Sequence, residues 1–97
     1  MNRLEHLMTI LNEECAELQQ ATSKALRFGL HDGYPETDRT NESDMRRELS
    51  QLFAVADMLR KEGLNLDPDY SAIKDKKAKE EHYLDYSKEK GALQVDD

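Results

Sequence analysis

Two long segments carry apolar residues at alternating spacings of three and four, and this spacing constrains the fold more than any other feature. The first segment, residues 3–28, has these residues at Leu4, Leu7, Leu11, Leu18, Ala21, Ala25 and Phe28. The second, about 43–62, has them at Met45, Leu49, Leu52, Phe53, Val55, Ala56 and Leu59. This period is typical of amphipathic α-helices, and neither segment contains proline or glycine. The sequence therefore predicts two long helices, the first stopped by Gly29 in the left-handed conformation and the second by Gly63.

The rest of the chain predicts a long loop, a weaker third helix and a tail. Residues 29–42, GLHDGYPETDRTNE, are rich in turn formers, and a loop of this length often has a role. The segment 65–70 is a turn in which Asp67 or Asp69 caps a helix over 69–90 and Pro68 suits a first helical position. The apolar face of this third helix is sparse. We expect one domain over residues 1–90 and a flexible C-terminal tail over 91–97.

The predicted fold class is all-α, because no segment alternates apolar and polar residues as a strand would. Three helices with only two strong apolar faces make an incomplete bundle. The first two helices of two copies would complete a four-helix-bundle core. The sequence therefore predicts a homo-oligomer, either a homodimer or a homotetramer.

The charge balance of the 97 residues limits the partners. There are 21 acidic and 14 basic side chains, giving a net charge of −7, which disfavours a nucleic acid polymer or an anionic membrane. The first residues lack a signal-peptide pattern, and the single cysteine, Cys15, rules out an internal disulfide. We expect a cytoplasmic protein in which Cys15 is a mostly buried thiol.

Carboxylates stand where the two apolar patterns require apolar residues. Glu14 is the one charged member of the first pattern, Glu48 is the one charged member of the second, and Glu17 follows Glu14 by three residues. Buried carboxylates need partners, which leaves three interpretations open. They pair with Lys or Arg of a neighbouring helix, they lie at the rim of a wider apolar face, or they hold a metal ion. Oxygen ligands without histidine favour Mg²⁺ or Mn²⁺ over Zn²⁺.

Three short runs carry a resemblance to a known family. They are EECAEL at 13–18, SKALRFG at 23–29 and RELSQL at 47–52. Together they resemble the MazG-like branch of the all-α nucleoside triphosphate pyrophosphohydrolases, which carries EExxE on one helix and ExxD on the next. The resemblance extends over about residues 3–90. It implies that water attacks the α-phosphorus of a nucleoside triphosphate, releasing the monophosphate and pyrophosphate, with Mg²⁺ or Mn²⁺ as cofactor.

The resemblance also assigns roles to individual residues. It implies metal ligands at Glu14, Glu17, Glu48 and Gln51, and catalytic carboxylates at Glu13 and Glu14, with Glu13 orienting or deprotonating water. It further implies substrate-binding residues, which are Lys24, Arg27, Lys76, Lys79 and Tyr83. The other interpretation of these basic residues is structural, as charges that complement a helix dipole or form surface ion pairs. Tyr34 either packs within the loop or stacks on a base.

Gln51 departs from the family pattern, because it stands where ExxD has its aspartate. An amide oxygen can coordinate Mg²⁺ but adds no negative charge. Two function hypotheses follow: a working pyrophosphohydrolase, or a catalytically impaired relative that binds a nucleotide or a protein. A third is an oligomer in which the glutamates form only salt bridges.

Overall fold

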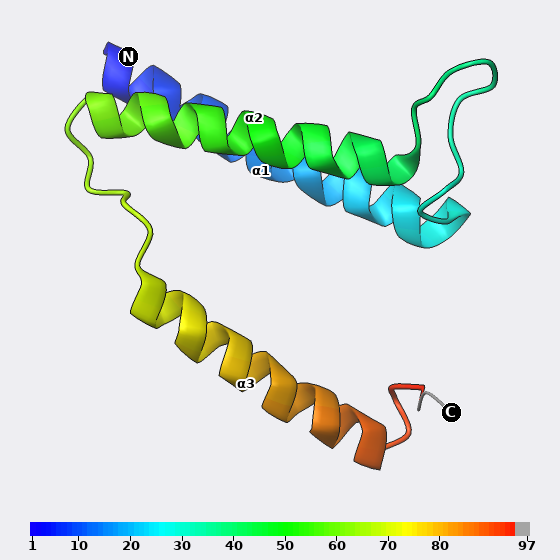
Figure 1. Ribbon diagram of the computed structural model, residues 1–97. Helices are drawn as coiled ribbons and strands as arrows, with labels where there is room; N and C mark the ends of the chain where they lie inside the picture. The colour runs from blue at the N-terminus through cyan, green and yellow to red at the C-terminus, as the bar shows by residue number, and fades with distance from the viewer. Residues whose placement is uncertain (95–97) are drawn as a thin grey trace. The chain divides into compact units, whose positions relative to one another are not determined.

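The computed structural model describes residues 1–94 and is all-α (Figure 1). Its helices are α1 (Arg3–Phe28), α2 (Asn41–Lys61) and α3 (Tyr70–Glu89). In residues 1–94 the only β-type pairing is an isolated bridge between Gly33 and Thr40. The chain divides into two compact units, Met1–Leu66 with α1 and α2, and a second unit from Asp67 onward with α3.

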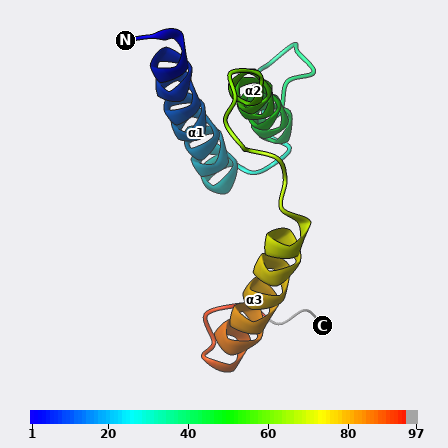
Figure 2. The ribbon, with the colours of Figure 1, turned by 90° about the vertical axis from the view of Figure 1, so that its left-hand side faces the viewer.

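Helices α1 and α2 run antiparallel and lie side by side (Figures 1 and 2). The apolar core between them consists of Leu7, Val55 and Leu59, with Leu4, Ile10, Leu11 and Leu64 packed around these three. Leu59 is completely buried, with 0 % of its surface exposed. The predicted helical periodicity is therefore confirmed where the first part of α1 packs against the last part of α2.

Helix α1 begins with a capping box, in which the Asn2 side chain accepts from the backbone N–H of Glu5 at 2.8 Å. It ends at Phe28, as predicted. Gly29 has a φ of 99°, which favours glycine, but its ψ of 151° is extended. The prediction that Gly29 adopts the left-handed helical conformation was therefore wrong in its ψ angle, because the backbone becomes extended at Gly29 as it enters the loop.

Helix α2 begins two residues earlier than predicted. The Thr40 side chain accepts from the backbone N–H of Ser43 at 3.1 Å, and the Ser43 hydroxyl accepts from the N–H of Thr40 at 2.9 Å. This reciprocal cap makes Ser43 the third helical residue instead of the first. The helix ends at Lys61, and Gly63 follows with a φ of 101°.

Helix α3 is capped by Asp69, whose side chain accepts from the N–H of Ala72 at 3.0 Å. Pro68 precedes the cap, so its predicted place at the first helical position was wrong. No residue of α3 is buried. The amides of Ala92 and Leu93 donate to the carbonyl of Ser87 at 2.9 and 3.2 Å. The end of the predicted tail, residues 95–97, lies outside the described residues.

Several large apolar side chains of the two-helix unit remain uncovered in the single chain. Phe53 is 60 % exposed and Leu49, one turn before it on α2, is also exposed, as are Phe28 and Leu26. Cys15 is exposed as well, so the prediction of a mostly buried thiol was wrong. The contact between α1 and α2 covers only part of each predicted apolar face.

None of the helices among residues 1–94 is long and apolar enough to span a membrane.

Candidate functional site

The two carboxylates that interrupt the apolar patterns lie together where α1 meets α2. Glu48 is only 7 % exposed and Glu14 is half-buried. The amide of Gln51, three residues after Glu48, reaches both of them. Its nitrogen lies 3.2 Å from Oε2 of Glu14 and 3.2 Å from Oε2 of Glu48. The orientation of this amide follows from its neighbours, because only its nitrogen can donate to two carboxylates.

The environment of Glu14 disfavours its negative charge. Desolvation raises the pKa of the Glu14 carboxyl, and repulsion from Glu17, Glu48 and Glu13 adds to the increase. Glu48 is paired with Arg47 at 3.5 Å, which belongs to the same helix. One interpretation of the sequence paired Glu48 with a basic side chain of a neighbouring helix. Among the described residues its ion pair is instead with Arg47 of its own helix.

The carboxylate and amide oxygens at this point suit a hard divalent cation whose remaining ligands are water or substrate oxygens. Among residues 1–94, no group of three or more His, Cys, Asp or Glu side chains is gathered as a metal-binding cluster. Glu14 and Glu48 nevertheless face a common point at the amide of Gln51. Mg²⁺ is commonly held by one or two carboxylates together with water and substrate phosphates. Two carboxylates suit that mode of binding, together with the Gln51 amide if it rotates so that its oxygen faces the ion.

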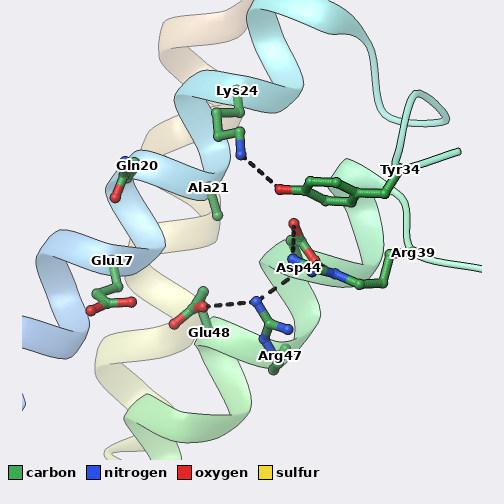
Figure 3. A pocket seen from close by; sticks show the side chains of 9 residues that line it. All are labelled: Glu17, Gln20, Ala21, Lys24, Tyr34, Arg39, Asp44, Arg47 and Glu48. Atoms are coloured by element: carbon green, nitrogen blue, oxygen red, sulfur yellow. Dashed lines mark hydrogen bonds and ion pairs between the residues drawn. The ribbon is translucent and has the colours of Figure 1, made fainter. Parts of the chain in front are cut away.

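A pocket of about 170 Å³ opens beside the carboxylates, between α1, α2 and the loop that joins them (Figure 3). Glu17 and Glu48 line one part of it, and Lys24 and Tyr34 line another. The remaining lining residues are Gln20, Ala21, Arg39, Asp44 and Arg47. The pocket thus places Glu17 and Glu48, with Arg47 paired to Glu48, apart from Lys24, while Arg39 is paired with Asp44.

Tyr34 is held in the pocket wall by two cations. Lys24 Nζ donates to the Tyr34 hydroxyl at 3.0 Å, and the Arg39 guanidinium lies 4.1 Å from the centre of the ring. The hydrogen bond from Lys24 lowers the pKa of the Tyr34 hydroxyl. Because Arg39 covers one face of the ring, Tyr34 packs within the loop, as the structural interpretation predicted.

Asp44 fixes the arginines of the pocket. It is buried and accepts hydrogen bonds from Arg39 Nε and Nη2, both at 3.2 Å. Arg47 Nη2 lies 3.8 Å from Oδ1 of the same carboxylate. Sequence reasoning missed this group. Arg47 and Glu48 follow Asp44 by three and four residues, which places all three on one side of the helix, and that spacing was the available signal. The approach of Arg39 depends on the path of the loop and had no such signal.

The loop is folded back on the start of α2. The N–H groups of Asn41 and Glu42 donate to the carbonyls of Asp32 and Leu30 at 2.8 and 3.0 Å. The buried Asn41 side chain donates to the carbonyl of Gly29 at 2.9 Å. The first backbone N–H groups of α2 are therefore already hydrogen-bonded to carbonyls of the loop. The pocket therefore depends on side chains for its positive charge.

Gly33→Ala is expected to displace this loop. A Cβ at Gly33 would lie 1.8 Å from the carbonyl oxygen of Arg39, which is backbone and cannot turn aside. Amide chemical shifts of residues 30–44 should change while circular dichroism still shows both helices. Gly63→Ala is the control: its φ of 101° strains an added Cβ locally, but no atom lies within 4 Å of that Cβ, so shift changes should stay near residue 63. Unchanged shifts around Tyr34 in Gly33→Ala would contradict the close approach.

The other predicted site residues are not all brought to the pocket. Glu13 is exposed and acts on Glu14 only through its charge. The Arg27 guanidinium lies 4.9 Å from the centre of the Phe28 ring and does not line the pocket. The remaining three belong to α3 in the second unit, and their substrate-binding role stays a prediction: Lys76, Lys79 and Tyr83. Lys76 is paired with Glu80 at 2.7 Å, which is the predicted surface ion pair.

Comparison with protein-family models, curated proteins and solved structures finds no match.

Proposed function

We propose that the chain is a Mg²⁺-dependent nucleoside triphosphate pyrophosphohydrolase, with Mn²⁺ as a possible substitute. The observation that carries the proposal is the division of charge in the pocket. Glu17 and Glu48 line one part of the pocket, with Arg47 paired to Glu48, and Lys24 lines another part with Tyr34. A metal-bound polyphosphate has the complementary distribution, with a cation at one point and anionic oxygens beyond it. The resemblance of the three sequence runs to the MazG-like family supports the same conclusion.

In this proposal the carboxylates Glu14, Glu17 and Glu48, with the oxygen of Gln51, hold the cation. The bound cation supplies charge neutralisation on the phosphate oxygens and polarises the α-phosphorus. Lys24 contacts the phosphate chain from the other part of the pocket. Water adds to the α-phosphorus, the bond to the bridging oxygen breaks, and pyrophosphate leaves. The proton that water loses passes to a carboxylate, the role that the resemblance gives to Glu13, which is exposed and next to Glu14 in the chain.

The test is a panel of canonical, deoxy and modified triphosphates incubated with the protein and Mg²⁺ or Mn²⁺. We expect pyrophosphate from at least one of them. Lys24→Met should raise KM for that substrate, whereas Lys77→Met, which changes an exposed lysine of α3, should not. Release from none of the panel, with metal binding shown by calorimetry, would exclude hydrolysis.

A second candidate function is binding of the same ligand without turnover. It is favoured by the amide of Gln51, which donates to Glu14 and Glu48 where the family has a fourth negatively charged ligand. An inert wild type that gains hydrolysis on Gln51→Asp substitution would establish this candidate. Turnover by both proteins would instead show that Gln51 is an adequate ligand.

We also propose that a second copy of the chain covers the exposed apolar surface of α2. A two-helix unit of this size buries too little surface to be stable alone. Leu49 and Phe53 are four residues apart on one face and both are exposed. Two such units would form the predicted four-helix bundle, as a homodimer or within a homotetramer.

Phe53→Glu should dissociate this assembly. A charge placed on the covered face would have to be desolvated, so the oligomer is expected to shift to a monomer with a lower melting temperature. Light scattering after size exclusion, at one fixed protein concentration, measures the mass. Gln19→Glu, at an exposed polar position of α1, should leave the mass unchanged. A wild type that is already monomeric would contradict the assembly.

A further inference from the structure

The Gln51 amide occupies the point between two carboxylates at which a cation would otherwise be expected. Its nitrogen is equally far, at 3.2 Å, from Oε2 of Glu14 on α1 and Oε2 of Glu48 on α2. A primary amide has two N–H donors, enough for one hydrogen bond to each carboxylate. The side chain therefore links the two helices through their only charged positions on the apolar patterns.

The electrostatics show why such a link matters. Glu14 is surrounded by Glu13, Glu17 and Glu48, all of which disfavour its charge. Glu48 is buried and its remaining partner is Arg47 on its own helix. No basic side chain among the described residues forms an ion pair with Glu14. The amide is thus the group that offsets repulsion between the carboxylates of α1 and α2.

We propose that Gln51 acts as a built-in substitute for the cation, holding Glu14 and Glu48 together when no metal is bound. The second half of the inference rests on the proposed function. With a divalent cation bound between the two carboxylates, Gln51 would rotate its amide so that the oxygen, in place of the nitrogen, faces the ion. Rotation of the amide exchanges a donor for an acceptor at the same position. Gln51 is accordingly a positioning residue. An aspartate at this position would lack the donor and would need the metal in order to assemble the site.

Thermal unfolding of the full chain, first with a chelator and then with saturating Mn²⁺, tests the inference. The variants are Gln51→Leu, which removes the donor, and Gln51→Asp, which replaces it with a charge. In chelator both should melt below the wild type by several degrees, Gln51→Asp by more, since it adds a third carboxylate. With Mn²⁺ the Gln51→Asp variant should gain more than the wild type and close the gap. Gln51→Leu should remain lower.

A merely structural glutamine would leave the same gap between wild type and Gln51→Asp in both conditions. Gln19→Asp, the same exchange at an exposed position of α1, should differ from the wild type in melting temperature by the same amount with and without Mn²⁺. Should Gln51→Asp fail to fold in chelator, Gln51→Leu still measures the donor. Melting temperatures equal to the wild type in chelator for both variants would overturn the inference. A loss in chelator with no Mn²⁺ response in any protein would support the role of Gln51 and contradict the metal-dependent function.

Discussion

Replacing Glu48 by glutamine should reduce pyrophosphate release about 10²–10³-fold, the usual cost of removing one preorganised charge from a reaction centre. Glu48 is the most buried carboxylate of the site, lies 3.5 Å from Arg47 and shares the Gln51 amide with Glu14. Glu48→Gln keeps the shape of the side chain and a carbonyl oxygen. The protein should therefore fold, while Mn²⁺ affinity measured by calorimetry falls together with the rate.

Glu81→Gln is the control for this experiment, because it removes one negative charge from an exposed position of α3. It should leave both the rate and the Mn²⁺ affinity within the error of the wild type. If Glu48→Gln retained wild-type activity, Glu48 would be a structural carboxylate paired with Arg47, and the site would have to lie elsewhere.

Leu59→Ala should produce the largest loss of stability. Leu59 is 0 % exposed and belongs with Leu7 and Val55 to the buried apolar cluster between α1 and α2. Truncation of a fully buried leucine costs about 2–5 kcal/mol, which combines lost burial with the cavity left behind. Because small domains have a total stability of only about 5–15 kcal/mol, unfolded chains should become detectable at room temperature. Urea unfolding followed by circular dichroism measures the change in the free energy of unfolding.

Leu26→Ala is the matched control for Leu59→Ala, since Leu26 is 83 % exposed. Its free energy of unfolding should stay within about 0.5 kcal/mol of the wild type. Equal losses from the two substitutions would mean that Leu59 does not belong to the apolar core between α1 and α2.

The helices and the carboxylates were predictable from the sequence because both depend on local period. An apolar pattern of 3.6 residues places Glu14 and Glu48 on faces that pack, so a single charge on each face stands out. The start of α2 was placed at Ser43 because several residues there can cap a helix. Only the reciprocal hydrogen bonds of Thr40 and Ser43 decide between them.

The part of the site around Lys24 was less predictable because it depends on contacts across the loop. Lys24 was a candidate, but its partner Tyr34 lies ten residues away and is brought near by the close approach of Gly33 to Arg39. Gln51 was recognised as a departure from ExxD. Its donation to two carboxylates could not be foreseen, because the sequence does not say which end of an amide faces a neighbour.

In the proposed reaction the pocket directs water to the α-phosphorus of a nucleoside triphosphate. Hydrolysis in ¹⁸O-labelled water, followed by ³¹P nuclear magnetic resonance, tests this most directly on a substrate found in the panel. We expect pyrophosphate and nucleoside monophosphate as the products, without orthophosphate, and with the label on the monophosphate. Label in pyrophosphate, or orthophosphate as a primary product, would contradict attack at the α-phosphorus and with it the proposed function.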